Sequence, residues 1–347
     1  MAGGAGERFW PRSRRARPKP LLAVLGGRTL LAAALERARA FAGPERVWLV
    51  CTAENAAAFR AESGLPRARV LVEPRGRNTA LAVGFAAAHV AAIDADAVTA
   101  FLPADHVIPD TRTFAAALGR AAEAADRGGA LVTLGIRPTR PDTGYGYIQV
   151  GAPIGRAHPG LRRVRRFREK PSLAVARRML RAGGHLWNAG IFVWRADAIL
   201  AELARWAPAL AGPLAAYRAR PSRARLERAY RSAPALPIDV AVLERSDRVW
   251  TLPVRFRWSD VGNWASLAEE LGVRPGRSRV VEGRALLIEA DGNLVWPSGD
   301  RLVSLIGVDG LAVVDAGDAL LVARLERAGD VRRVVAELRR RRAFALL

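Results

Sequence analysis

Apolar residues along the chain form short runs that alternate with longer helical stretches as far as about residue 265. Consecutive apolar residues bounded by turn residues predict buried strands at 47–51, 70–72, 98–102 and 130–136. Helical spacing of apolar residues predicts helices at 30–41, 79–92, 114–127 and 196–205. This alternation indicates an α/β fold with a mixed, mostly parallel sheet and helices on both faces. Ligands of such sheets bind beyond the carboxyl ends of the strands.

The pattern changes in the last part of the chain. Further strands are predicted at 144–150, 163–167 and 191–194, but after residue 270 short apolar segments are separated by turn pairs such as Asp291-Gly292 and Asp309-Gly310. Such spacing is typical of a small β-rich unit. An amphipathic helix at 331–339 follows. We therefore predict two domains, residues 1–270 and 271–347, with the boundary near 272–276.

The chain is strongly basic, with a formal net charge of +22. The cationic residues are spread over predicted helices and strands rather than gathered in a tail, and no basic aromatic RNA-binding motif occurs. This favours small polyanionic substrates over nucleic acid. Of the 55 lysines and arginines only two are lysines, Lys19 and Lys170, so 53 are arginines. Lysine is a compact point charge, so these two positions are candidates for contacts that the arginine fork cannot make.

Cysteine and histidine are too few to suggest a metal or disulfide framework. The single cysteine, Cys51, excludes an internal disulfide and argues against a thiolate zinc site. The four histidines show no metal-ligand spacing. No apolar stretch is long enough to span a membrane, and nothing resembles a signal peptide. We expect a cytoplasmic enzyme.

The opening of the chain is rich in glycine, with Gly3, Gly4 and Gly6 ahead of Arg8 and Lys19. Glycines let backbone amides approach a pyrophosphate, which the two cations can neutralise. Taken alone, a plain turn explains these glycines equally well. A phosphate-binding loop normally follows a strand, yet Met1 almost adjoins the glycines. Either a central strand precedes the given start or the protein lacks that strand. We expect the first, because loss of a central strand would leave unpaired ladder groups on its neighbours.

Two acidic residues stand just after predicted strands, and a third lies in a tryptophan-flanked segment. Asp105 follows the strand at 98–102, Asp260 lies in WSDVGNW, and Glu73 opens EPRGRNTA. Magnesium prefers a few carboxylates together with substrate oxygens. Glu73 can accept from the N–H groups of a base, and Asn78 or Thr79 can cap the following helix. A loop-capping aspartate and a helix cap beside a solvated glutamate explain the same residues without any ligand.

Eight motifs in order give the chain a resemblance to a known family. They are GGAGERFWP with a following PK, EPRGRNTA, FLPADH, DTGYGYI, FREKP, WNAGIF, PIDVAVLE and WSDVGNW. Together they resemble the bacterial mannose-1-phosphate guanylyltransferases, which are sugar-nucleotide pyrophosphorylases, over roughly residues 1–340. Pro20 departs from the family pattern, as do Pro237 and Val240 in PIDVAVLE. Longer relatives carry an added isomerase domain, and we expect the short, single-function form here.

The resemblance implies a Rossmann-like nucleotidyltransferase domain and a left-handed β-helix-like C-terminal domain. It implies that GTP and mannose 1-phosphate are the substrates and that Mg²⁺ is held by Asp105 and Asp260. From the short strands of the C-terminal part, which can form a coiled β unit that packs against another subunit, we expect a homodimer. The implied catalytic residues are Arg8, Lys19, Asp105, Asp260 and Lys170. The implied nucleotide-binding residues are Gly3, Gly4, Gly6, Glu73, Pro74, Asn78 and Thr79. The implied sugar-binding residues are Gly144, Tyr145, Glu169, Asn188 and Asp239.

Two alternatives to this function stay open. In the first, the chain is another sugar-1-phosphate nucleotidyltransferase, using glucose 1-phosphate, UTP or dTTP. In the second, it is a catalytically inactive regulatory subunit that binds a sugar nucleotide. The presence together of Arg8, Lys19, Asp105 and Asp260 argues against the inactive subunit. We also expect Lys170→Arg to impair turnover, because the guanidinium is bulkier than the ammonium.

Overall fold

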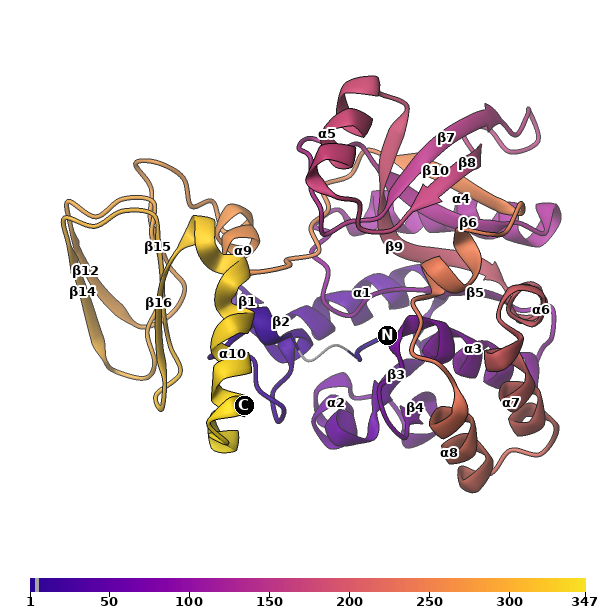
Figure 1. Ribbon diagram of the computed structural model, residues 1–347, viewed down its shortest axis with the longest axis horizontal. Helices are drawn as coiled ribbons and strands as arrows, with labels where there is room; N and C mark the ends of the chain where they lie inside the picture. The colour runs from indigo at the N-terminus through magenta and orange to yellow at the C-terminus, as the bar shows by residue number, and fades with distance from the viewer. Residues whose placement is uncertain (4–5) are drawn as a thin grey trace.

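The computed structural model describes residues 1–3 and 6–347. Its larger part contains a six-stranded sheet with the order β5-β9-β6-β10-β8-β7 (Figure 1). These strands are β5 (Val98–Phe101), β6 (Leu131–Ile136), β7 (Tyr147–Pro153), β8 (Arg162–Arg168), β9 (His185–Arg195) and β10 (Val249–Val254). A separate pair, β3 (Leu49–Thr52) and β4 (Val70–Glu73), is parallel. The strands predicted from apolar runs are present, with ends shifted by a few residues.

The predicted mixed α/β fold is confirmed, and the strand directions refine it. β9 pairs antiparallel with both β5 and β6, so β5 and β6 point the same way. β10 is parallel to β6 and antiparallel to β8. Neighbouring strands within this sheet are therefore mostly antiparallel, because β9 lies between two strands that share a direction and β8 is antiparallel to both β10 and β7.

The first residues of the chain lie between the two sheets. Ala2 forms a parallel bridge with Cys51 at the end of β3. The amino group of Met1 donates to the carbonyl of Leu102 at 2.8 Å. The glycine-rich segment therefore starts at the edge where β3 and β5 end, which is the edge where a ligand is expected.

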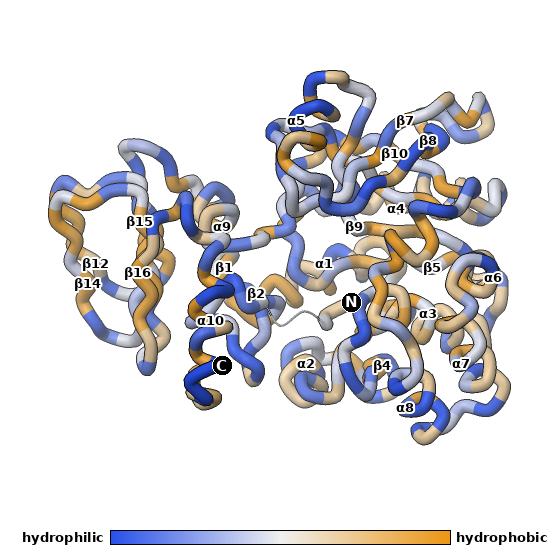
Figure 2. The backbone as a smooth tube through the Cα atoms, in the orientation of Figure 1, coloured by the Kyte–Doolittle hydropathy of each residue, from blue (hydrophilic) through white to orange (hydrophobic). Residues whose placement is uncertain are grey.

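Helices cover both faces of the six-stranded sheet. The helices of the larger part of the chain are α1 (Leu30–Ala42), α2 (Ala56–Ser63), α3 (Asn78–Ala91), α4 (Thr111–Gly128), α5 (Leu173–Ala182), α6 (Ala196–Trp206), α7 (Pro208–Ala219), α8 (Arg223–Ser232) and α9 (Trp264–Glu270). On β9, Phe192 and Trp194 pack into the core that contains α3 and α6, whereas Ile191 and Val193 pack into the core that contains α4. This alternation along a strand builds two cores, one on each face. Figure 2 shows hydrophobic residues along β9 and α3.

Two details differ from the predictions. The helix predicted at 79–92 begins at Asn78, and its N-cap is Arg77 without a side-chain cap. The proposed caps are therefore wrong: the hydroxyl of Thr79 instead accepts from the amide of Ile238 at 2.8 Å, and Asn78 accepts from the adjacent Thr79 amide. The sequence pattern also does not predict the strand β10 or the helices α2, α5, α7, α8 and α9.

The C-terminal part coils its strands as a β-helix does. β11 (Arg279–Val280), β13 (Leu294–Trp296) and β15 (Leu311–Asp315) are parallel neighbours, and β12 (Arg284–Ile288) is parallel to β14 (Leu302–Ile306). β16 (Leu320–Arg324) turns back against β15, and α10 (Val331–Arg340) follows. Figure 1 shows α10 beside β1 (Ala23–Leu25) and β2 (Arg28–Thr29). Among the described residues, none of the helices combines the length and apolar character that a membrane crossing requires.

One hydrophobic core joins the C-terminal part to the beginning of the chain. The ring of Phe9 meets that of Trp264 edge-on at 4.8 Å, and Trp264 meets Trp296 at 6.0 Å. Val331 and Val335 of α10 belong to the same core. The segment after the glycines is therefore held by residues on both sides of the predicted boundary near 272, and that boundary stays a prediction.

Candidate active site

A cavity of about 380 Å³ opens where the glycine segment, the β5 edge and the loop after β10 converge. Its lining residues are Gly6, Glu7, Arg8, Phe9, Lys19, Asp105, His106, Asp260, Gly262 and Arg332. Of the predicted site residues, it brings together Gly6, Arg8, Lys19, Asp105 and Asp260. Gly4 lies outside the described residues. Six of the ten lining side chains carry a formal charge at neutral pH, which suits a polyanionic ligand with a counter-cation.

Lys19 links two of the converging segments. Its Nζ donates to Asp105 Oδ2 at 2.6 Å and to the carbonyl oxygen of Asp260 at 2.6 Å. The Lys19 side chain is only 8% exposed. Gly6 packs against it with a φ of +63°, and a Cβ at Gly6 would lie 2.5 Å from Lys19 Cβ. Glycine is therefore required at this turn both for its conformation and for space.

Asp105 carries its charge at neutral pH. Burial alone would raise its pKa, but the ammonium of Lys19, through its charge and its hydrogen bond, lowers the pKa below the ordinary range. Asp260 accepts at Oδ1 from the hydroxyl of Tyr145 at 2.8 Å. A Cβ at Gly262 would lie 3.1 Å from Asp260 Oδ2, so this glycine leaves room for the carboxylate. Two carboxylates therefore line the cavity from separate loops.

The donor set suits a magnesium ion better than a transition metal. One oxygen of each carboxylate is engaged, Oδ2 of Asp105 by Lys19 and Oδ1 of Asp260 by Tyr145. The other oxygens have no hydrogen-bond partner within the described part of the chain. In that same part no group of three or more His, Cys, Asp or Glu side chains is placed to hold a metal. Mg²⁺ is bound by one or two carboxylates and completes its shell with water and substrate phosphates.

His106 adds a neutral ring to the cavity. Burial lowers its pKa to about 4, although the neighbouring carboxylates oppose the shift. The indole Nε1–H of Trp258 donates to His106 Nδ1 at 3.1 Å. Behind the loop, the buried Arg37 donates to the carbonyl of His106 at 2.8 Å. These bonds fix the loop that presents Asp105.

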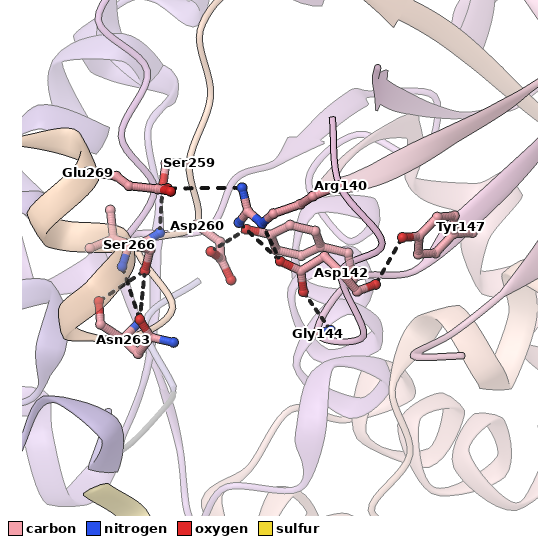
Figure 3. Close-up of polar contacts among 11 residues, drawn as sticks. Arg140, Asp142, Gly144, Tyr147, Ser259, Asp260, Asn263, Ser266 and Glu269 are labelled. Carbon is pink, nitrogen blue, oxygen red and sulfur yellow. Dashed lines mark hydrogen bonds and ion pairs between the residues drawn. The ribbon is translucent and has the colours of Figure 1, made fainter. Parts of the chain in front are cut away.

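The loop before β7 reaches across to the loop that contains Asp260 (Figure 3). Arg140 pairs with Asp142 at 3.0 Å and approaches Glu269 of α9 at 4.0 Å. Tyr145 lies against the indoles of Trp187 and Trp258, with ring centroids 5.0 and 5.2 Å away. Gly144 donates its amide to Asp142 at the exposed turn. Tyr145, predicted to bind sugar, is thus also placed to orient Asp260.

The remaining predicted sugar-side residues gather in a second cluster. Asn188 donates through Nδ2 to Asp239 Oδ1 at 2.8 Å. Burial, with the nearby Glu169 carboxylate, raises the pKa of Asp239 to about 7. Lys170 pairs with Glu169 at 2.8 Å, and its side chain is 62% exposed. A Cβ at Gly146 would lie 2.5 Å from Glu169 Oε2, so glycine is needed for this approach.

A third group surrounds Glu73, the last residue of β4. Glu73 is 3% exposed, and its Oε1 accepts from the hydroxyl of Tyr230 at 3.0 Å. Burial raises the pKa of Glu73 to about 7. Gly3 lies beside it, since a Cβ there would be 3.8 Å from Glu73 Oε2. Pro74 follows at a bend, and Asn78 and Thr79 open α3.

Sequence reasoning missed four residues of this site. Arg332 comes from α10, Tyr230 from α8, and His106 and Gly262 adjoin predicted residues. Nothing in the local pattern around Arg332 or Tyr230 distinguishes them from neighbouring helix residues. His106 and Gly262 lie within the motifs FLPADH and WSDVGNW. Their positions in these motifs are the sequence feature that could have identified them as site residues.

Comparisons with known proteins cover nearly the whole chain. Residues 1–272 match the family model described as nucleotidyl transferase, and residues 283–338 match the MannoseP isomerase/GMP-like beta-helix domain. Xanthan biosynthesis protein XanB of Xanthomonas campestris pv. campestris is 36% identical over 98% of this chain and 72% of its own length. Mannose-1-phosphate guanylyltransferase RfbM of Salmonella typhimurium is 36% identical, with the same coverage. A solved structure from Thermus thermophilus, named mannose-1-phosphate geranyltransferase, superposes with a TM-score of 0.88 at 38% identity, covering 98% of this chain and all of that one.

The raised pKa of Glu73 predicts a pH-dependent stability. Its folded-state value of about 7 exceeds the ordinary 4.5, so the protonated form favours folding and this contribution is lost as pH rises through 7. Glu73→Gln should therefore raise the free energy of unfolding at pH 8, by up to about 3 kcal/mol, and have little effect at pH 4.5. Urea denaturation at both pH values measures this. Exposed Glu54→Gln serves as control, and an unchanged or lowered stability of Glu73→Gln at pH 8 contradicts the assignment.

Proposed function

The chain belongs to the nucleotidyl transferase family, with a C-terminal domain of the MannoseP isomerase/GMP-like β-helix kind, and on this premise we propose that it transfers GMP from GTP to α-mannose 1-phosphate. The products are GDP-mannose and pyrophosphate. The observation that carries the proposal is the convergence of Lys19, Asp105 and Asp260 in one charged cavity.

The proposed reaction is a direct displacement. An oxygen of the mannose 1-phosphate group attacks the α-phosphorus of GTP, and the bond from that phosphorus to the bridging oxygen of the β-phosphate breaks. The electron pair leaves with pyrophosphate, and no proton needs to be removed because the attacking phosphate is already ionised. Arg8, Lys19 and Lys170 offset the repulsion between the two polyanions and hold them in line.

A magnesium ion fits this arrangement. Asp105 and Asp260 would hold it, and it would supply neutralisation of the phosphate charge. Lys19, by bonding to both loops, keeps the two carboxylates at the same cavity. The hydroxyl of Tyr145, by donating to Asp260, keeps that carboxylate turned toward the cavity.

Base and sugar recognition are proposed for the other two clusters. Ionised Glu73 offers two acceptor oxygens to the N1–H and N2–H₂ groups of guanine, with Gly3, Pro74, Asn78 and Thr79 around it. The glycine segment, Gly4 and Gly6 included, would approach the phosphates. Glu169 and Asp239 offer carboxylate acceptors, and Asn188 offers the amide, that sugar hydroxyls need. Gly144 lies in the loop before β7, next to Tyr145.

The names of relatives support mannose 1-phosphate, since both RfbM and the Thermus protein are named for it. They differ in the group transferred. A cavity lined mainly by charged side chains suits a triphosphate rather than a geranyl group, which would need apolar walls. The cytoplasmic location stays a prediction.

A homodimer is also proposed, through the C-terminal strands. Leu286 and Ile288 of β12, and Leu302 and Ile306 of β14, leave 44 to 67% of their surface exposed on one parallel strand pair. A flat apolar strand face is self-complementary across a two-fold axis. We expect a dimer mass by light scattering and a monomer for Ile306→Arg, with Ile93→Arg, which is equally exposed, remaining dimeric. A monomeric wild type contradicts this proposal.

A substrate panel tests the function. Purified protein with Mg²⁺ is given GTP, UTP or dTTP, each with mannose 1-phosphate or glucose 1-phosphate, and pyrophosphate release is measured. We expect the highest kcat/KM for GTP with mannose 1-phosphate. A preference for glucose 1-phosphate with UTP or dTTP supports the first alternative, and absence of turnover with every pair supports the inactive subunit.

Lys19→Arg should lower kcat/KM on the order of 100-fold, because the larger guanidinium cannot bond to both loops beside Gly6. The steric argument applies here rather than at Lys170, whose exposed side chain has room for the change. Lys170→Arg is the matched comparison, and its kcat/KM should fall less than that of Lys19→Arg. Equal losses in steady-state assays, or full activity of Lys19→Arg, would contradict the assigned role.

A further inference from the structure

Arg332 lines the phosphate cavity although it is the second residue of α10, far along the chain from the other lining residues. We propose that Arg332 binds the pyrophosphate portion of the nucleotide and stabilises it as the leaving group. The proposal rests on the proposed nucleotidyl transfer. It makes the C-terminal domain a contributor to the active site.

The fold fixes α10 against the glycine segment. Arg339 of α10 forms an ion pair with Glu7. Val331 and Val335 are buried in the core that contains Phe9 and Trp10. The indole of Trp10 donates to the carbonyl of Leu346, beyond the end of the helix, at 2.8 Å. The backbone at Arg332 is therefore packed against the chain segment that contains Arg8.

Two of the cations that line the cavity have no carboxylate partner within the described residues. Lys19 is paired with Asp105, and Glu7 is paired with Arg339. Arg8 and Arg332 form no ion pair within residues 1–3 and 6–347. Two exposed guanidiniums directed at one cavity repel each other, and a bound polyphosphate relieves that repulsion. Arginine forks bind phosphate oxygens through two parallel bonds.

The position of the cavity identifies which anion is bound. Its lining includes neither Glu169, Lys170, Asn188 nor Asp239, so the predicted sugar cluster lies elsewhere. The anion at Arg332 is therefore the triphosphate and not the sugar phosphate. Negative charge accumulates on the β-phosphate as the bond to the α-phosphorus breaks, and a guanidinium there stabilises the transition state as well as the product.

Arg332→Ala and Arg333→Ala form a matched pair. The two residues are adjacent on α10 and both are exposed, but Arg333 does not line the cavity. Calorimetric titration of the full chain with magnesium pyrophosphate should show binding weakened about tenfold by Arg332→Ala and unchanged by Arg333→Ala. In steady-state assays, KM should rise about tenfold for GTP and for pyrophosphate in the reverse reaction, with KM for mannose 1-phosphate unchanged. Arg332→Lys should recover part of the loss.

The outcomes separate this proposal from the proposed function. Equal pyrophosphate affinities in the two variants, or a rise only in KM for mannose 1-phosphate, overturn the role of Arg332. Failure of wild-type protein to bind magnesium pyrophosphate overturns it too. If pyrophosphate binding depends on Arg332 but no sugar phosphate is turned over, the anion site is supported and the proposed substrates are not. Thermal unfolding of both variants checks that α10 remains docked.

Discussion

The rest of the site depends on the two hydrogen bonds that the Lys19 ammonium donates to Asp105 and Asp260. This ammonium is buried, and a buried charge is tolerated only with close partners, which here are the Asp105 carboxylate and the Asp260 carbonyl. These partners come from the ends of different strands. One side chain therefore sets how the two acid-bearing loops face each other, and Gly6 gives it the space to do so.

The walls around these bonds come from parts of the chain that are distant in sequence. The edge-on rings of Phe9, Trp264 and Trp296 link the segment after the glycines, through α9, to the C-terminal strands. Arg37 supports the Asp105 loop from behind, and Tyr145 supports Asp260 from the sugar side. The phosphate cavity and the C-terminal domain therefore share one hydrophobic core.

Much of the fold followed from local pattern, and less of the site did. Apolar runs located β3 to β6, and glycine turn pairs located the C-terminal strands, because both signals are local. The direction of β9 and the existence of α7 and α8 depend on long-range packing, which local pattern does not contain. The motifs named Lys19, Asp105 and Asp260, but only the fold shows that Lys19 bonds to both loops. Arg332 and Tyr230 lack any motif, since their roles arise solely from where their helices dock.

The central claim is that these charges position two phosphates for direct displacement, with no covalent intermediate on the protein. The stereochemical course at phosphorus tests it most directly. One diastereomer of GTP with sulfur at the α-phosphorus is converted to product, and ³¹P NMR identifies the configuration. We expect inversion, as a single in-line displacement requires. Retention would contradict it, because two displacements through a nucleotidylated side chain such as His106 would then be needed.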